Sequence, residues 1–284
     1  MLEAREGAIV SSDRFFIRPA TTDDIKEMSG VLERAGLSSF GPEILEFNMT
    51  GSSSQMFVGC RDGLVVGVAG CVRFGRTGWL GNVAVDDDFR GQGLGRAISQ
   101  TAVDCLHRAG VETVLLTATK LGKPIYERLG FADEGVSYGI WEQQQAPVLG
   151  CDRSAAVEPG QIDEAIRQDA ETTGEDRRSY LVPFPDRARV VAGRSQAGYR
   201  VALPWGGGPV IAASRAAARP LLVDMIRTSP GARLAFPELN VHGAALAVSL
   251  GFRLARRVRR MRLGPPVPGF RPGMIYNAFS LAAG

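Results

Sequence analysis

Histidine and cysteine are scarce in this sequence, and neither is arranged to hold a metal. The chain has two histidines, His107 and His242, which are far apart in the sequence. Zinc sites and redox dithiols need closely spaced ligands or thiols. No C-x-x-C spacing occurs among the four cysteines, Cys60, Cys71, Cys105 and Cys151. We therefore predict no metal site, and we expect free thiols buried in apolar strands and helices.

Long apolar runs and a strong net charge are also missing. No run of about 18 apolar residues could span a bilayer, and Glu3, Arg5 and Glu6 stand where a secretion signal needs an apolar core. The formal charge is +3, from 33 basic and 30 acidic residues, so no strong field for nucleic acid is indicated. We expect a soluble, cytoplasmic protein with no nucleic-acid and no membrane partner.

Most of the basic residues are arginines, and several gather near the C-terminal end of the chain. Lysine occurs only at positions 26, 120 and 123. The arginine cluster follows Leu250-Gly251-Phe252 on a predicted strand and consists of Arg256, Arg257, Arg259, Arg260 and Arg262. We favour a solvated strand face whose charges protect against edge pairing, over a site for an anionic partner.

The most informative segment that is present is the glycine-rich stretch Arg90-Gly91-Gln92-Gly93-Leu94-Gly95-Arg96. An apolar strand at 83–85 precedes it, and a helical pattern over 97–109 follows it. A glycine-rich turn that opens a helix presents bare N–H groups at the positive end of the helix dipole, which suits a pyrophosphate. The segment therefore indicates a nucleotide-like cofactor.

Two common phosphate-binding loops do not fit this segment. A P-loop requires Gly-Lys-Ser/Thr, whereas Arg96 and Ala97 follow Gly95. The dinucleotide fingerprint G-x-G-x-x-G fails in both registers, because its last position is Arg96 counted from Gly91 and Ile98 counted from Gly93. The segment has the form R-x-x-G-x-G instead.

Three further segments occur in a fixed order around this loop. Phe15 to Ile25 reads as a short strand that leads into a helix, and 55–60 and 64–73 read as strands joined by an Asp62-Gly63 hairpin turn. After the loop come a β-rich run at 111–118 and the sequence Pro-Ile-Tyr-Glu-Arg-Leu-Gly-Phe at 124–131. Over residues 14–142 this order resembles the GNAT superfamily of acyl-CoA-dependent N-acyltransferases.

The resemblance implies acetyl-CoA as cosubstrate and a definite set of binding positions. In the family, the strand before the loop separates from the next strand, and the pantetheine arm bonds its open edge. One amide on this strand would hold the oxyanion of the tetrahedral intermediate. Thr119 stands where the family commonly has an asparagine that contacts the cofactor arm. The implied cofactor-binding residues are Val83, Ala84, Val85, Arg90, Gly91, Gln92, Gly93, Leu94, Gly95, Arg96 and Thr119.

By the same resemblance, Tyr126 takes the place of the general acid that protonates the departing CoA thiolate. The alternative is that Tyr126 is only a core aromatic on an amphipathic helix. No carboxylate occurs in Leu80-Gly81-Asn82, where family members often place a base. Asn82 or the Asp133-Glu134 pair could act through ordered water, and the base is not assigned.

The length of 284 residues predicts two domains, which we place at 1–149 and 150–284. The second half resembles a degenerate copy of the first. Leu250-Gly251-Phe252 repeats Leu129-Gly130-Phe131, but Ala247 stands in the place of Tyr126, and 212–217 contains no glycine. We predict an α/β (α+β) protein of two tandem GNAT-like folds, each a mixed, mostly antiparallel sheet flanked by helices, with only the first domain catalytic.

Together these features predict an N-acetyltransferase that moves an acetyl group from acetyl-CoA to a primary amine by direct attack in a ternary complex. A small-molecule amine is favoured over a protein amino group, and we expect it between residues 22–51 and the C-terminal lobe. The alternative is an acyl-CoA-binding sensor or scaffold that has lost its chemistry. The sequence predicts neither the acceptor nor the oligomeric state.

Overall fold

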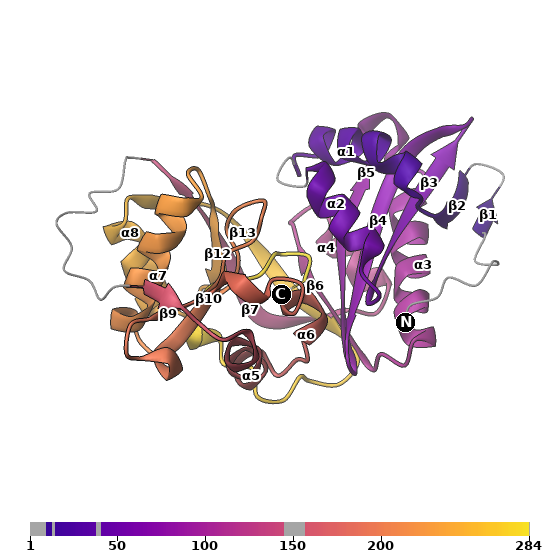
Figure 1. Ribbon diagram of the computed structural model, residues 1–284. Coiled ribbons are helices and arrows are strands. Elements are labelled where there is room, and N and C mark those ends of the chain that lie inside the picture. The colour runs from indigo at the N-terminus through magenta and orange to yellow at the C-terminus, as the bar shows by residue number, and fades with distance from the viewer. Residues whose placement is uncertain (1–9, 13–14, 38–40, 145–156, 284) are drawn as a thin grey trace.

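The computed structural model describes residues 10–12, 15–37, 41–144 and 157–283, which form two lobes of sheet and helix (Figure 1). The predicted domain boundary at 149/150 and Cys151 lie outside these residues. Cys60, Cys71 and Cys105 are free thiols, and the last two are buried. No helix in the described part is long and apolar enough to cross a membrane.

The N-terminal half builds most of a long sheet, with helices on both of its faces. Helix α1 buries Met28, Val31 and Leu32, which share one face at helical spacing, against the sheet. Asp62 and Gly63 both have positive φ, as the predicted tight hairpin requires. The elements are β1 (Val10–Ser12), β2 (Phe15–Pro19), α1 (Ile25–Arg34), α2 (Pro42–Thr50), β3 (Ser54–Arg61), β4 (Leu64–Phe74), β5 (Thr77–Val85), α3 (Leu94–Arg108), β6 (Thr113–Ala118), α4 (Lys123–Arg128) and β7 (Ala132–Gln143).

The C-terminal half repeats this order of elements in a shorter form. Its helices α7 and α8 pack on a second apolar core that includes Leu222, Leu246 and Phe252. The elements are β8 (Val157–Pro159), α5 (Ile162–Thr173), α6 (Arg178–Leu181), β9 (Ala188–Val191), β10 (Gly198–Val201), β11 (Val210–Ala212), α7 (Arg215–Thr228), β12 (Leu234–Pro237), α8 (Val241–Ser249), β13 (Phe252–Leu263) and β14 (Ile275–Asn277).

The two halves exchange strands. One nine-stranded sheet has the order β1-β2-β3-β4-β5-β6-β13-β7-β12, and a five-stranded sheet has the order β14-β11-β10-β9-β8. Strand β13 of the second half pairs with β6 of the first, while β7 of the first half pairs with β12 of the second. The mixed α/β fold with two sheets agrees with the prediction, but the first half does not complete its own sheet.

The expected role of the arginine cluster as edge protection is wrong, because β13 is an interior strand. It is hydrogen-bonded to β6 on one side and to β7 on the other. Carboxylates of β7 neutralise part of the charge of the strand: Arg259 pairs with Asp133 at 2.8 Å, and Arg262 pairs with Glu134 at 3.0 Å. The Arg259 guanidinium lowers the pKa of Asp133 to about 2.

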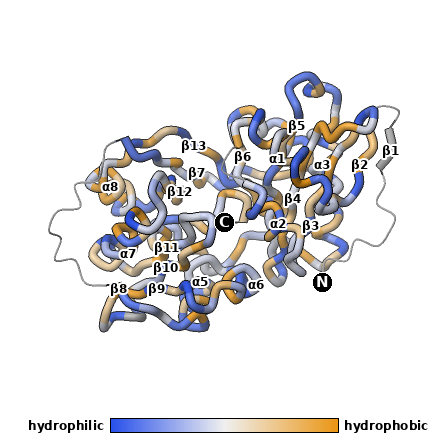
Figure 2. The backbone as a smooth tube through the Cα atoms, turned by 45° about the horizontal axis from the view of Figure 1, so that its top comes forward, coloured by the Kyte–Doolittle hydropathy of each residue, from blue (hydrophilic) through white to orange (hydrophobic). Residues whose placement is uncertain are grey.

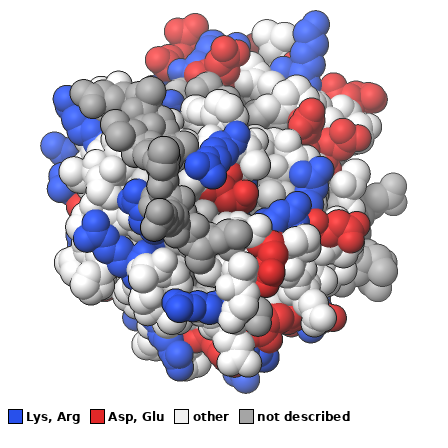
Figure 3. Space-filling model, turned by 60° about the vertical axis from the view of Figure 1, so that its left-hand side comes forward, with Lys and Arg blue, Asp and Glu red and all other residues white. Residues whose placement is uncertain are grey.

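Hydrophobic stretches run along the central strands β3 and β4, whereas many peripheral loops are hydrophilic (Figure 2). A shared core joins the lobes, with Phe74 and Trp79 of the first half packed against Tyr180, Tyr199 and other residues of the second. On the face of the C-terminal lobe shown in Figure 3, basic and acidic side chains are interspersed. The lobes therefore form one continuous packed unit.

Candidate active site

Strands β5 and β6 separate part of the way along the sheet. They pair in parallel only from Thr77, opposite Thr113, to Trp79, opposite Leu115. Beyond that point β5 continues to Val85 and β6 continues to Ala118 without a ladder between them. The split expected before the glycine loop is present, and it leaves an edge of β5 that includes Val83, Ala84 and Val85 open to a ligand.

A bulge in β5 marks the start of the separation. Asn82 has φ of 54°, a left-handed conformation that is uncommon for a residue with a side chain. The register between β4 and β5 shifts between Val68 and Gly70, close to this residue. A bulge increases the local twist and bends the strand that carries it. We attribute the divergence of β5 from β6 to this bulge.

The glycine loop lies at the end of β5 and opens helix α3. Gly91 and Gly93 have φ of 74° and 92°, so both need glycine for conformational reasons. A Cβ on either glycine would meet no atom within 4 Å, so the loop surface is open. The backbone N–H of Arg90 donates to the Asp87 carbonyl, and the backbone N–H of Ala97 donates to the Gly93 carbonyl. The amides between them, from Gly91 to Arg96, have no hydrogen-bond acceptor among the described residues.

Two charged side chains that precede the loop, Asp86 and Arg90, are already paired. Arg90 bonds the Val85 carbonyl at 3.0 Å and Asp87 at 2.6 Å. Asp86 forms an ion pair with Arg34 at 2.6 Å, and this guanidinium lowers the pKa of the carboxyl. Asp86 is therefore held ionised by its partner and fixes the entry into the loop.

Tyr126 lies on α4, which packs against α3 beside the split. Its ring contacts Phe131 edge-on, with centroids 6.0 Å apart, and its side chain belongs to the same core as Leu94 and Ala118. Burial raises the pKa of Tyr126 to about 12, so the phenol keeps its proton at neutral pH. This protonation state suits a proton donor.

Thr119 lies on the turn that leads into α4. Its side chain is exposed, and its hydroxyl oxygen accepts the Gly122 N–H at 3.1 Å. In this position the threonine stabilises the turn that carries Tyr126. Its Oγ retains further hydrogen-bonding capacity toward a ligand.

A cavity of about 580 Å³ lies between the two lobes, at the same bulge. The first half contributes residues of α2, β4 and β5, including Phe47 and Asn82, and the second half contributes Trp205, Arg256 and the segment 277–283. Part of its wall is aromatic: the Phe47 ring lies 5.2 Å from both Tyr180 and Trp205, measured between centroids. The cavity lies in the region where we expected the acceptor.

Segment 278–283 passes between the lobes and reaches the separated strands. Thr117 of β6 donates its hydroxyl proton to the Leu281 carbonyl at 2.8 Å. On the other strand, a Cβ on Gly81 would stand 2.3 Å from the Cβ of Ala282. The segment therefore spans the split on the side of the cavity.

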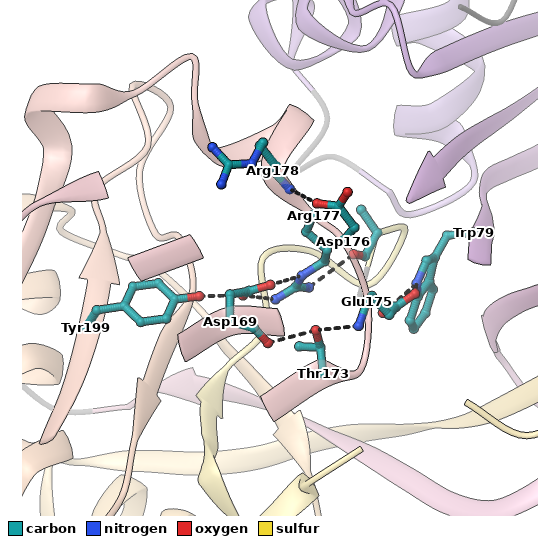
Figure 4. A network of polar contacts seen from close by, with 9 residues as sticks. Trp79, Asp169, Thr173, Glu175, Asp176, Arg177, Arg178 and Tyr199 are labelled. Carbon is teal, nitrogen blue, oxygen red and sulfur yellow. Dashed lines mark hydrogen bonds and ion pairs between the residues drawn. The ribbon is translucent and has the colours of Figure 1, made fainter. Parts of the chain in front are cut away.

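A buried polar network anchors the same segment (Figure 4). Arg177 pairs with Asp169 at 2.5 Å and donates to the Ala283 carbonyl at 3.2 Å. The adjacent Glu175 accepts a hydrogen bond from Trp79 Nε1 at 2.9 Å, and burial raises its pKa. This network ties the C-terminal lobe to β5 below the split.

Asn82, Asp133 and Glu134, which could act on the amine through ordered water, differ in their surroundings. Asp133 and Glu134 are engaged with arginines of β13 and do not line the cavity. Asn82 does line it, and its Oδ1 is buried without a hydrogen-bond partner. Of these three residues, Asn82 alone lines the cavity. The individual cavity residues of the second half had no signal in the sequence, because pairing and packing between distant segments bring them to the site.

The C-terminal lobe lacks the corresponding loop. Its helix α7 begins after Ser214, whose hydroxyl oxygen accepts the Ala217 N–H at 3.2 Å. Ala247 occupies the position that corresponds to Tyr126 and is fully buried.

Among the described residues, no group of three or more histidine, cysteine, aspartate or glutamate side chains could hold a metal ion.

Comparisons with known proteins agree with this geometry. Residues 52–133 match the family model of the acetyltransferase (GNAT) domain. A protein of Pyrococcus horikoshii assigned as an acetyltransferase is 20% identical, with 99% of this chain and 100% of that chain covered and a TM-score of 0.83. A GCN5-related N-acetyltransferase from Sphaerobacter thermophilus is 16% identical, with coverages of 93% and 99% and a TM-score of 0.64. The first of these likenesses extends over both lobes.

Proposed function

We propose that this protein transfers an acetyl group from acetyl-CoA to a primary amine of a small molecule, because residues 52–133 match the acetyltransferase (GNAT) domain. In this proposal residues 1–149 form the catalytic domain, and residues 150–284 form a degenerate GNAT-like domain that completes the acceptor site. The contribution of the second domain rests on the cavity, which residues of both halves line.

The observation that carries the proposal is the row of unpaired amides from Gly91 to Arg96 at the start of α3. Backbone N–H groups and the helix dipole at such a terminus stabilise a pyrophosphate. The open edge of β5 lies next to this loop, so a ligand held by its phosphates can extend its arm along Val83 to Val85. Acetyl-CoA has this combination of a diphosphate head and an amide-bearing arm.

The chemistry is a direct displacement at the thioester carbonyl. The amine nitrogen forms a bond to the carbonyl carbon, the C–S bond breaks, one N–H proton is lost, and the CoA sulfur gains a proton. A β5 amide donates to the developing oxyanion. Tyr126 donates its phenolic proton to the departing CoA thiolate, and a thiol has a pKa of about 8.5. Asn82 orients the amine or the water that takes up its proton.

A second reading, that of an acyl-CoA sensor without chemistry, rests on one specific observation. No Asp or Glu lines the cavity in the described ranges, so no carboxylate base is in direct reach of an amine there. The amine would then have to lose its proton to water alone.

Release of the CoA thiol in the presence of a panel of primary amines tests the choice between these functions. Amine-dependent thiol release, reduced in Tyr126→Phe, supports the transferase. Tight binding of acetyl-CoA without turnover of any amine in the panel would support the sensor instead.

A further inference from the structure

The charged side chains that line the cavity between the lobes are basic. Arg233 and Arg256 line it, and no Asp or Glu of the described chain does. Arg233 pairs with Glu142 at 3.1 Å. Arg256 forms no ion pair with a described residue, whereas Arg257 on the same strand is paired with Glu238 at 2.7 Å. Strand β13 therefore presents one uncompensated guanidinium to the cavity.

At the split, the cavity presents a polar group with an unfilled hydrogen-bonding site. Asn82 is 8% exposed, and its Oδ1 has no hydrogen-bond partner. A buried amide oxygen without a hydrogen-bond partner destabilises the folded protein, so its retention needs an explanation. This oxygen accepts hydrogen bonds, so the N–H groups of an amine complement it.

Between these polar groups the wall is largely apolar and aromatic. Phe47, Trp205 and Phe279 line it, together with the apolar residues Ile44 and Leu281. Aromatic side chains of this kind enclose an apolar body and exclude water from it. The lining thus combines an amide at the split, a largely apolar and aromatic wall, and two arginines.

This inference rests on the proposed transferase function and names its acceptor. We infer that the acceptor is a primary amine that carries a carboxylate or phosphonate-type anion on an apolar body, as in an apolar amino acid. The amine lies against Asn82 at the split, and the anion pairs with Arg256. A guanidinium binds carboxylate and phosphate oxygens through two parallel hydrogen bonds. A polyamine would instead bring a second cation to the arginines, which opposes its binding.

Equilibrium binding to the full-length protein in the presence of CoA tests this assignment without any need for turnover. The probes are matched pairs that differ only in the anion: phenylalanine and phenethylamine, tryptophan and tryptamine, and leucine and isoamylamine. The phosphonate analogue of phenylalanine distinguishes the two kinds of anion. We expect at least one carboxylate-bearing member to bind at least about tenfold more tightly than the amine that lacks the carboxylate.

Two arginine variants on β13 give the test its control. Arg256→Gln is expected to reduce the preference for the anionic member to about twofold or less. Arg253→Gln removes the same charge from an exposed position on β13 that does not line the cavity, and it should leave the preference unchanged. Both variants are checked for folding by their melting temperatures.

The inference is overturned if no probe with a carboxylate or phosphonate binds, if every amine that lacks the anion binds as tightly as its partner, or if Arg256→Gln keeps the full preference. These outcomes are separate from failure of the proposed function. A protein that binds anionic amines selectively but transfers no acetyl group to them would refute the transferase and retain the site.

Discussion

Gly81 on β5 and Ala282 pack so closely that a Cβ on the glycine would stand 2.3 Å from the Cβ of the alanine. The contact holds segment 278–283 against the separated strands and makes the second half a wall of the cavity. Only glycine permits this approach at position 81. The close contact between the two lobes at the site therefore depends on the absence of a side chain at position 81.

The first prediction follows from this contact. Gly81→Ala forces the 278–283 segment away from β5 and is expected to cost about 1–3 kcal/mol of unfolding free energy, as overpacking does. Because the displaced segment lines the cavity, KM for the acceptor amine should rise more than KM for acetyl-CoA. Gly273→Ala is the control, since a Cβ there meets nothing within 4 Å. Unchanged stability and unchanged acceptor KM in Gly81→Ala would contradict the contact.

The second prediction concerns the glycine loop. Gly93→Ala places a methyl group in open space but forces alanine to a φ of 92°, which costs about 1–2 kcal/mol. We expect CoA affinity, measured by calorimetry, to fall roughly tenfold. Gly95 has no positive φ, and a Cβ there would only touch Ile125 and Val85 at 3.6 Å. Gly95→Ala should therefore leave the stability of the protein unchanged. A loss of CoA affinity in this variant would indicate that the bound ligand lies in contact with the backbone at position 95.

The third prediction separates catalysis from packing at Tyr126. Tyr126→Phe keeps the ring in the core and removes the proton donor, so kcat should fall about a hundredfold with little change in CoA affinity. Since burial raises the pKa of this phenol to about 12, its ionisation should add no falling limb to the wild-type pH–rate profile below pH ~10. Tyr138→Phe removes another buried phenol, on β7, and is the matched control. Equal kcat losses in both variants would indicate a packing effect.

The fourth prediction uses the buried carboxyl of Glu175. Burial raises its pKa above that of the unfolded chain, so its contribution to stability is greatest at low pH and is lost as the pH rises through the folded-state value. Glu175→Gln should therefore be at least as stable as the wild type at pH 8 and should show a weaker pH dependence in urea unfolding.

A second variant at this position tests the hydrogen bond itself. Glu175→Ala leaves Trp79 Nε1 without its acceptor and should lose about 1–3 kcal/mol of unfolding free energy. A strong loss of stability in Glu175→Gln at pH 8 would show instead that the ionised carboxylate is needed by Arg177 and Arg260.

Local patterns predicted most elements of this fold. The strands expected at 55–60 and 64–73 are found at Ser54–Arg61 and Leu64–Phe74, and the helix expected over 97–109 is found at Leu94–Arg108. Side-chain periodicity and turn residues carry this information within a short window. Pairing between distant segments has no such signal.

The strand exchange and the individual residues that the second half contributes to the cavity could not be predicted for this reason. The charges of β13 suggested an exposed edge, because the carboxylates that neutralise them, Asp133 and Glu134, are more than a hundred residues away in the sequence. The glycine loop was found from its own residues. Asn82 was noticed only as one polar option, since its left-handed backbone and its unpaired oxygen arise in the folded sheet.

Calorimetric titration of the purified protein with CoA and with pantetheine tests the central claim most directly. The account predicts that CoA binds and that pantetheine, which lacks the diphosphate, binds at least about a hundredfold more weakly, because charged hydrogen bonds from the 91–96 amides are lost. Equal affinity for the two compounds, or no affinity for CoA, would contradict it.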